Sequence, residues 1–215
     1  MIAMIAGVDE AGRGCILGPM VLCVLYCRKV DEPRLRKLGV KDSKLLSPRQ
    51  REELEPQIRK MCTANVVVVD APELNVMMET ESLNEIEAIK IAHSLNSTKL
   101  KAEMVYIDSP DNIPKNFELR IRKYLNDKMH ITSQNKAESR FPVVAAASIV
   151  AKVARDGFIE KIKKEIGIDF GSGYTSDPRT IAFLQEHAYD ANVKPYLRTK
   201  WKTLDNIRQK KLGDF

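Results

Sequence analysis

The sequence predicts an α/β fold whose sheet contains both parallel and antiparallel strands. Two apolar runs, residues 2–8 and 20–26, follow each other closely, so we expect antiparallel pairing at the start of the chain. Three shorter strands are predicted at residues 66–69, 103–108 and 129–132, and segments of helical periodicity lie between them. Strands that alternate with helices after an initial run of strands are typical of an α/β sheet.

Capping signals mark where the predicted helices begin. Ser47-Pro48-Arg49-Gln50 has the form of a capping box with proline at the first helical position, which predicts a helix over 48–61. A second box, Ser82-Leu83-Asn84-Glu85, opens a helix with apolar residues around most of its circumference, so we expect that helix to be buried. The longest helix is predicted from 143 to about 166, and Asp177-Pro178 caps another that runs to about 188.

Composition and charge limit the class of protein. The chain has 215 residues, of which 44% are hydrophobic, as expected for a globular domain with an appendage. The formal net charge of +6 favours a polyanionic partner, and nucleic acid is the first candidate. The four cysteines form no Cys-x-x-Cys pair, which predicts buried, reduced thiols. We expect a cytoplasmic protein, because neither a signal peptide nor about 18 consecutive apolar residues is present.

Three carboxylates lie at predicted strand ends in distant parts of the chain. Asp9 and Glu10 follow the first strand beside glycines, and Asp108 closes the strand at 103–108. Ligand sites of open α/β sheets lie beyond the carboxyl ends of strands, so these groups are expected to converge. In a basic protein such a cluster predicts two divalent cations that drive phosphodiester hydrolysis. Asp9-Glu10 taken alone fits a solvated turn equally well.

Five ordered blocks of sequence point to one family. The chain resembles the type 2 ribonucleases H, the ribonuclease HII family, along nearly its whole length. The sequence of the last block is most similar to that of the archaeal and eukaryotic branch. The blocks are Gly-Val-Asp-Glu-Ala-Gly-Arg-Gly at 7–14, Lys-Asp-Ser-Lys-Leu-Leu at 41–46, Tyr-Ile-Asp-Ser at 106–109, Pro-Val-Val-Ala-Ala-Ala-Ser-Ile-Val-Ala-Lys-Val-Ala-Arg-Asp at 142–156, and Gly-Ser-Gly-Tyr-Thr-Ser-Asp-Pro at 171–178.

The resemblance implies a fold and an activity. The fold would be a ribonuclease H-like mixed five-stranded sheet flanked by helices, with a helical C-terminal extension. We expect a catalytic domain at 1–170, a substrate-contacting extension at 171–208 and a clamp-binding tail at 209–215. The implied activity is a two-metal endonuclease, using Mg²⁺ or Mn²⁺, that cleaves the RNA strand of RNA/DNA hybrids. It would also incise 5′ of single ribonucleotides in duplex DNA during replication or repair, leaving 3′-hydroxyl and 5′-phosphate ends.

The resemblance also assigns the metal ligands. Asp9, Glu10 and Asp108 match the metal-binding carboxylates of the family. The family's fourth carboxylate is usually an aspartate, whereas this chain has Glu138, whose additional methylene adds roughly 1.5 Å of reach. Direct ligation by Glu138, ligation through water and no ligation all stay open, with Asp156 as the alternative fourth ligand.

Substrate-contacting residues follow from three of the blocks. Gly12, Arg13 and Gly14 match a turn that reads the ribose 2′-hydroxyl, the group that separates RNA from DNA. Tyr174 matches a tyrosine that stacks on the deoxyribose after the ribonucleotide, and Lys44 lies in a block that contacts phosphate. The glycines could equally only shape a turn, Arg13 could be a general phosphate contact, and Tyr174 could be an ordinary loop aromatic. Ser148, in the helix block, is expected to pack behind the site, and its hydroxyl is a candidate to face polar groups.

The last 22 residues are strongly basic. They contain seven Lys or Arg residues and two acidic residues. Such a segment can bind the phosphates of a duplex without base specificity. Gln209, Leu212 and Phe215 resemble a shortened clamp-binding peptide, with spacings that suit a 3₁₀-like turn. A basic terminus without a partner is an equal alternative.

Two rival hypotheses remain beside a monomeric ribonuclease HII. A type 3 ribonuclease H shares the carboxylates but usually carries an additional N-terminal domain, for which Asp9 lies too close to the start. A catalytically silent protein that binds hybrids or a clamp would explain the altered fourth carboxylate. Cleavage of a duplex containing one ribonucleotide distinguishes these hypotheses.

Overall fold

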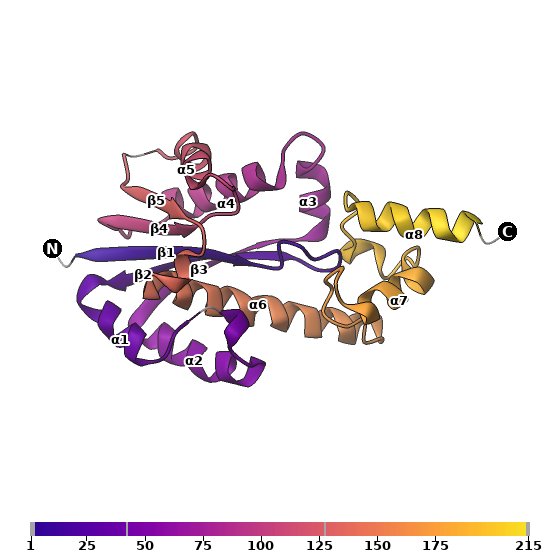
Figure 1. Ribbon diagram of the computed structural model, residues 1–215, viewed down its shortest axis with the longest axis horizontal. Helices are drawn as coiled ribbons and strands as arrows, with labels where there is room; N and C mark the ends of the chain where they lie inside the picture. Colours follow the sequence, from indigo (N-terminus) through magenta and orange to yellow (C-terminus); the bar gives the residue numbers. More distant parts are fainter. Residues whose placement is uncertain (1–2, 42, 127, 214–215) are drawn as a thin grey trace. The chain divides into compact units, whose positions relative to one another are not determined.

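A sheet of five strands organises the chain (Figure 1). The computed structural model describes residues 3–41, 43–126 and 128–213, with side chains as far as residue 207. The strand order is β3-β2-β1-β4-β5, in which β1 runs antiparallel to β2 and parallel to β4, and β4 runs parallel to β5. The predicted mixed sheet is therefore confirmed. The strands are β1 Met4–Ala11, β2 Met20–Arg28, β3 Cys62–Val69, β4 Met104–Asp108 and β5 Ile131–Gln134.

The helices begin where the capping signals predict. Ser47 and Gln50 form the reciprocal capping box of α2. The second box is only half formed, because Ser82 accepts from the Glu85 N–H while the Glu85 carboxylate bonds to Arg120, Lys123 and Tyr124. The α-helices are α1 Glu32–Lys37, α2 Pro48–Met61, α3 Ala71–Met77, α4 Leu83–Ser97, α5 Pro114–Arg122, α6 Pro142–Ile166, α7 Pro178–His187 and α8 Lys202–Gly213. Short 3₁₀ turns are η1 Lys29–Asp31, η2 Ser43–Leu45, η3 Ala137–Ser139 and η4 Lys194–Tyr196.

Two compact units make up the chain. The first unit contains the segments up to Ala11, Val21–Val67 and Ser82–Ala154. The second unit contains Gly12–Met20, Val68–Glu81 and the chain from Arg155 onward. Within the described residues, no helix is long and apolar enough to cross a membrane.

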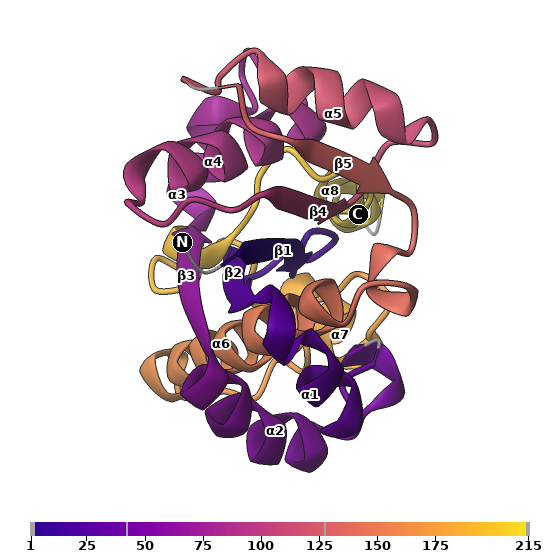
Figure 2. The same cartoon turned by 90° about the vertical axis from the view of Figure 1, so that its left-hand side faces the viewer.

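The first unit is layered. Helices α4 and α5 lie on one face of the sheet, and α1, α2 and the first part of α6 lie on the other (Figure 2). On the side of α2 and α6, the core is formed by residues of β2 that pack against the apolar start of α6. Cys23 and Cys27 of β2 are fully buried in this core. The four cysteines are free and buried, as predicted.

Gly7 allows α6 to approach the sheet closely. A Cβ atom built at Gly7 would lie 2.4 Å from the backbone carbonyl carbon of Val143 and 2.6 Å from the backbone nitrogen of Val144, far inside any real contact. Only glycine permits this approach of helix backbone to strand backbone. The close contact brings the first turns of α6 against β1, two residues before Asp9.

The second unit has its own apolar core. Ile159 and Ile162 of α6 pack with Phe183 and Leu184 of α7 and with Leu204 of α8. The loop between α6 and α7 contains Gly171-Ser172-Gly173-Tyr174, as predicted.

Three strand predictions and three helices need correction. β3 begins at Cys62, four residues before the predicted start, because Thr63 and Asn65 interrupt the apolar signal there. β5 lies two residues later than predicted, because its alternation continues through buried Ser133, a polar residue that gives no apolar signal. β1 continues to Ala11 because its pairing with β2 extends as far as Val21. The sequence prediction missed α1, α3 and α5, which are short helices whose buried apolar residues are few and stand among polar or charged ones.

Candidate active site

Three carboxylates converge in the first unit. Asp9, Glu10 and Asp108 each offer an oxygen, and these oxygens all lie within 4.8 Å of one another. The parallel pairing of Val8 with Ile107 places the next residues, Asp9 and Asp108, level on neighbouring strands. The carboxylates lie in the last residues of the strands, and not in the turn after β1 as the sequence suggested.

Burial and mutual repulsion act on this cluster. Burial raises the pKa of Asp9 well above its usual value, and the charges of Glu10 and Asp108 raise it further. Burial also raises the pKa of Asp108. Hydrogen bonds partly oppose this, because the Glu10 N–H donates to Asp9 Oδ1 at 2.7 Å. The fold holds these carboxylate oxygens together despite their mutual repulsion. Such a set of oxygen donors suits a hard divalent cation.

Ser148 joins the cluster to the segment that contains Lys44. Its hydroxyl hydrogen-bonds the Asp9 carboxylate and lies 2.8 Å from the hydroxyl of Ser43. Both serines are buried. The sequence prediction expected only packing here with a possible polar contact. Ser148 is the one hydroxyl in the apolar stretch 143–151, and that signal could have identified it.

Glu138 lies beside Asp108. The pKa of Asp108, raised by burial, is lowered in part by a hydrogen bond with the Glu138 side chain. Lys136 turns the chain at this point with a left-handed backbone (φ 56°), which is uncommon for a residue other than glycine. Asp156, the alternative fourth ligand, belongs to the second unit and is ion-paired with Arg155 at 3.3 Å.

Basic side chains lie near Asp108 and Glu138 in the first unit. Lys44 is exposed on η2, and its charge lowers the pKa of Asp108. A cavity of about 270 Å³ next to Glu138 is lined by Arg36, Lys41 and Arg140 among others. Asp42, in the same sequence block as Lys44, lies outside the described residues.

The Gly12–Gly14 turn and Tyr174 meet in the second unit. Gly12 has a φ of +81°, and its N–H donates to Tyr174 Oη at 3.2 Å. Cys15 and Tyr174 form an isolated antiparallel bridge. Burial raises the pKa of Tyr174 to about 12, so the phenol is neutral at physiological pH. Arg13 is partly exposed, while its carbonyl accepts from Arg198 at 2.9 Å.

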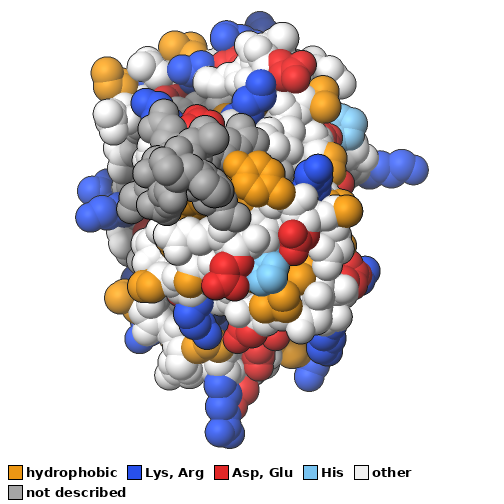
Figure 3. Space-filling view, turned by 90° about the vertical axis from the view of Figure 1, so that its right-hand side faces the viewer, with side chains coloured by type: hydrophobic (Ala, Val, Ile, Leu, Met, Phe, Trp, Pro, Cys, Tyr) orange, Lys and Arg blue, Asp and Glu red, His pale blue; other side chains and the backbone are white. Residues whose placement is uncertain are grey.

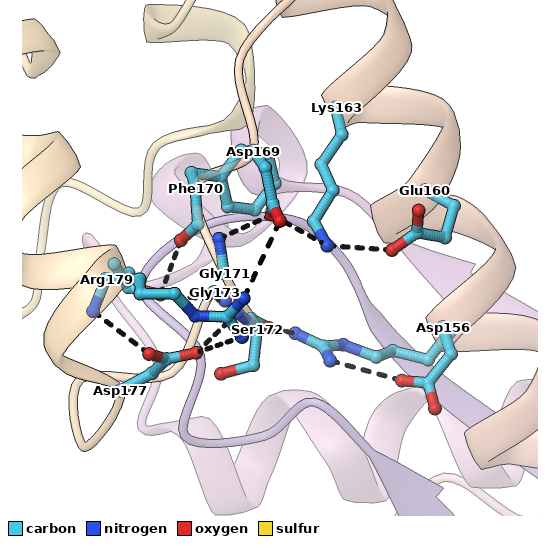
Figure 4. Close-up of polar contacts among 12 residues, drawn as sticks. Asp156, Glu160, Lys163, Asp169, Phe170, Gly171, Ser172, Gly173, Asp177 and Arg179 are labelled. Atoms are coloured by element: carbon cyan, nitrogen blue, oxygen red, sulfur yellow. Dashed lines mark hydrogen bonds and ion pairs between the residues drawn. The ribbon is translucent and has the colours of Figure 1, made fainter.

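Side chains hold the loop that carries Tyr174. Figure 4 shows Asp169 and Asp177 directed at the loop backbone. Asp169 accepts from the Gly171 N–H at 2.9 Å, and Asp177 accepts from the Ser172 N–H at 2.8 Å. The Gly173 N–H donates to the Thr180 hydroxyl at 3.0 Å. These N–H groups are consequently engaged within the protein, and the loop presents Tyr174 instead of an open cradle for an anion.

The basic C-terminal segment differs from its prediction at Arg198. This residue is fully buried and donates to the Gly18 carbonyl at 2.9 Å, so it is unavailable to grip phosphate as predicted. Figure 3 shows Lys and Arg side chains standing apart on one face, with Asp and Glu side chains between them. Gln209 and Leu212 lie on the backbone of α8, which is α-helical to Gly213 and not a 3₁₀-like turn, whereas Phe215 lies outside the described residues.

The fold and the carboxylate cluster define a class of protein, the metal-dependent nucleases with a ribonuclease H-like fold. The ribonuclease HII family model matches residues 6–204, and the chain belongs to that family. It is a hydrolase of the ribonuclease H class, which acts on RNA/DNA hybrids and depends on divalent metal ions.

Relatives and solved structures agree with this family. Ribonuclease HII of Archaeoglobus fulgidus is 45% identical over 99% of this chain and 100% of its own length. Ribonuclease HII of Nanoarchaeum equitans is 49% identical, with coverage of 97% and 98%. Ribonuclease HII in a PCNA complex from A. fulgidus superposes with a TM-score of 0.86 at 44% identity, covering 98% of this chain and 100% of that one. Ribonuclease H2 of Pyrococcus horikoshii gives 0.84 at 38% identity, with coverage of 96% and 98%.

A type 3 enzyme shares the fold alone. A ribonuclease HIII solved with Mn²⁺ gives a TM-score of 0.80, but it is only 20% identical, and the match covers 97% of this chain and 70% of that one. The match of the ribonuclease HII family model to residues 6–204 decides against the rival hypothesis of a type 3 enzyme.

Proposed function

We propose that the protein incises duplex DNA 5′ of single embedded ribonucleotides in addition to cleaving RNA/DNA hybrids, as a monomer that removes ribonucleotides in replication or repair. The convergence of Asp9, Glu10 and Asp108 within 4.8 Å is the observation that carries this proposal. Two Mg²⁺ or Mn²⁺ ions bound there would activate water and stabilise the leaving oxygen, giving 3′-hydroxyl and 5′-phosphate ends.

The protein's own groups prepare this centre. The Glu10 N–H and the Ser148 hydroxyl fix the orientation of the Asp9 carboxylate, so its oxygens are directed before a substrate arrives. The hydrogen bond between Glu138 and Asp108 supports Glu138 as the fourth ligand-bearing carboxylate, because its longer side chain still reaches the cluster. We propose Asp156 as structural, since Arg155 engages it.

Substrate recognition is proposed for two groups of residues. Lys44 and the basic cavity beside Glu138 would contact phosphates, which steers and holds nucleic acid without reading sequence. Gly12, Arg13 and Gly14 would contact the ribose and its 2′-hydroxyl. The half-buried ring of Tyr174 would stack on the following deoxyribose. Its hydrogen bond with the Gly12 N–H supports a shared role, because it joins the tyrosine to the turn.

A sliding clamp is the proposed protein partner. The PCNA complex of the A. fulgidus relative supports this partner for the present chain. Gln209 would be the polar contact, and Leu212 and Phe215 would be the apolar anchors. Residues 209 and 212 are three apart on α8, which places both on one side of a helical turn.

The test is product mapping with the purified full-length chain. The substrate is a DNA duplex with one ribonucleotide and a label at either end, incubated with Mg²⁺ or Mn²⁺ and, as a control, with a chelator. We expect a single metal-dependent incision 5′ of the ribonucleotide that leaves a 3′-hydroxyl. An all-DNA duplex should stay intact. Hybrid binding without any cleavage in either metal would instead support the silent-binder hypothesis.

A further inference from the structure

Arg155 is a fully buried cation in the second unit that the proposed chemistry does not use. Only 1% of its side chain is exposed. A guanidinium is rarely buried to this degree, because desolvation is costly unless good partners compensate for it. Asp156 is a weak partner, since the bond is 3.3 Å long and that carboxylate is 36% exposed. The closer contacts of Arg155 are with the loop that carries Tyr174 and with the turn after Gly12.

The guanidinium is bonded to both of these segments. Its Nη2 donates to the Ser172 carbonyl, in the residue two before Tyr174, and the same nitrogen lies 2.8 Å from Cys15 Sγ. Cys15 is fully buried, and its backbone forms the isolated antiparallel β-bridge with Tyr174. One nitrogen therefore connects the two segments that carry the proposed ribose and deoxyribose contacts.

Arg155 also lies against the aromatic ring. Its central carbon is 4.7 Å from the centroid of the Tyr174 ring, a cation–π distance. The hydroxyl end of Tyr174 is held separately, because it accepts a hydrogen bond from the Gly12 N–H. The ring is thus held at its face by Arg155 and at its oxygen by the turn.

Two glycines show how closely the arginine fits. A Cβ at Gly12 would lie 3.2 Å from Arg155 Cγ and 3.3 Å from its Nε. A Cβ at Gly173 would lie 3.1 Å from Arg155 Nη2 and 2.6 Å from the Leu17 carbonyl oxygen. The backbones of both turns consequently pack directly on this side chain, and the positive φ at both positions favours glycine as well.

We propose that Arg155 is a positioning residue that fixes the Tyr174 ring against the Gly12 turn and so sets the preference for a ribonucleotide–DNA junction over a long hybrid. This inference rests on the proposed role of Tyr174. Lysine is not equivalent to the arginine here, because its ammonium is not a planar group that can lie against the ring while its end bonds to Ser172 and Cys15. Cys15 acts in the same assembly as the acceptor that orients the fork.

The test is a double-mutant cycle on two substrates. Single-turnover rates are measured on a single-ribonucleotide duplex and on a long hybrid for wild type, Arg155→Lys, Tyr174→Ala and the double variant. We expect Arg155→Lys to lower the junction-to-hybrid rate ratio by about tenfold, since misplacing a positioned group by about 1 Å can cost up to 10²-fold. In the Tyr174→Ala background, Arg155→Lys should leave the ratio unchanged.

Controls separate positioning from loss of stability. Phe183→Leu destabilises the same unit, because Phe183 packs 5.5 Å from Phe170, yet it should leave the ratio unchanged. Cys15→Ala keeps the guanidinium and should shift the ratio in the same direction as Arg155→Lys, but less. If Arg155→Lys unfolds the protein, Arg155→Gln, which keeps a planar polar head without the charge, becomes the deciding variant.

The possible failures can be told apart. An unchanged ratio in Tyr174→Ala overturns the proposed role of the tyrosine and this inference with it. A lowered ratio in Tyr174→Ala, together with a wild-type ratio in Arg155→Lys and Cys15→Ala, overturns only the inference. An equal effect of Arg155→Lys with and without Tyr174 also overturns it, because the arginine would then act by another route.

Discussion

The backbone N–H of Ala137 donates a hydrogen bond of 2.8 Å to Asp108 Oδ1. This bond ties the η3 turn to the end of β4, and the stacked rings of Tyr106 and Phe141, 4.0 Å apart, close the same turn from its other end. Glu138 follows Ala137 directly, so its position beside Asp108 is fixed by the backbone of the turn. Glu138 therefore lies where we propose the fourth carboxylate of the site.

Glu138→Ala should lower Mg²⁺-supported cleavage strongly, on the order of 10²-fold, with partial recovery in Mn²⁺, which takes similar oxygen ligands. Glu138→Asp should retain or raise activity. Rates in each metal are compared with those of Ser139→Ala, a neighbouring variant on the same turn. Wild-type rates of Glu138→Ala in both metals would place the fourth ligand elsewhere, with Asp156 the next candidate.

Tyr174→Phe should lower the junction-to-hybrid rate ratio less than Tyr174→Ala does. The phenylalanine keeps the stacking ring and loses the hydroxyl, which hydrogen-bonds the Gly12 N–H and the Cys15 side chain. A hydrogen bond of this kind is worth about 0.5–1.5 kcal/mol, or roughly a 2- to 12-fold effect. Equal ratios in wild type, Tyr174→Phe and Tyr174→Ala would mean that the tyrosine is only structural.

Asp177 should make part of the protein's stability depend on pH in the acidic range. Hydrogen bonds from the Ser172 and Arg179 N–H groups lower its pKa to about 2, below the value of about 3.9 expected in an unfolded chain. Its contribution is therefore fully present above pH 4 and is lost as the pH falls through 2. Asp177→Ala removes the α7 cap and should lower the Tm by about 2–4 °C at pH 7.

The difference in Tm between wild type and Asp177→Ala should narrow as the pH is lowered from 5 toward 2. Asp177→Asn is the matched control, because it can keep the capping acceptor without the charge. A difference that stays constant over this range would show that the charge of Asp177 contributes nothing.

Deleting residues 209–215 should abolish binding of a sliding clamp in a titration and leave cleavage of a short duplex within about twofold of wild type. The apolar anchors should supply most of the affinity, so Leu212→Ala should weaken binding by about 1 kcal/mol or more. Lys210→Ala is the control for charge. Undiminished clamp binding by the truncated chain would show that the tail is only a basic terminus.

Local signals predicted much of this fold. Ser47-Pro48 and Asp177-Pro178 place the starts of α2 and α7 at Pro48 and Pro178, because capping chemistry is local. Tertiary contacts decided the rest. Glu85 completes no capping box because Arg120 on α5 takes its carboxylate, and a sequence window around Ser82 contains no trace of that residue.

The candidate site was predictable in part. Asp9, Glu10 and Asp108 could be found because they end predicted strands and match a family motif. Arg198 was misassigned as a phosphate contact because charge alone does not reveal burial, and its carbonyl partners, Gly18 and Arg13, are some 180 residues away in sequence. The contacts of Arg155 with Cys15 and Ser172 were hidden for the same reason.

The central claim is that the carboxylate cluster holds the metal ions that drive hydrolysis, and the cleavage rate of Asp108→Asn tests it most directly. The substrate is the single-ribonucleotide duplex in Mg²⁺, under single-turnover conditions and with substrate affinity measured in parallel. We expect the cleavage rate to fall by at least about 10³-fold, which corresponds to several kcal/mol of transition-state stabilisation. Substrate affinity should be nearly unchanged. The Tm measured in chelator should be at or above that of wild type, because the repulsion between Asp108 and Asp9 is relieved. Wild-type turnover by this variant, with metal-free controls inactive, would contradict the assignment of the metal site.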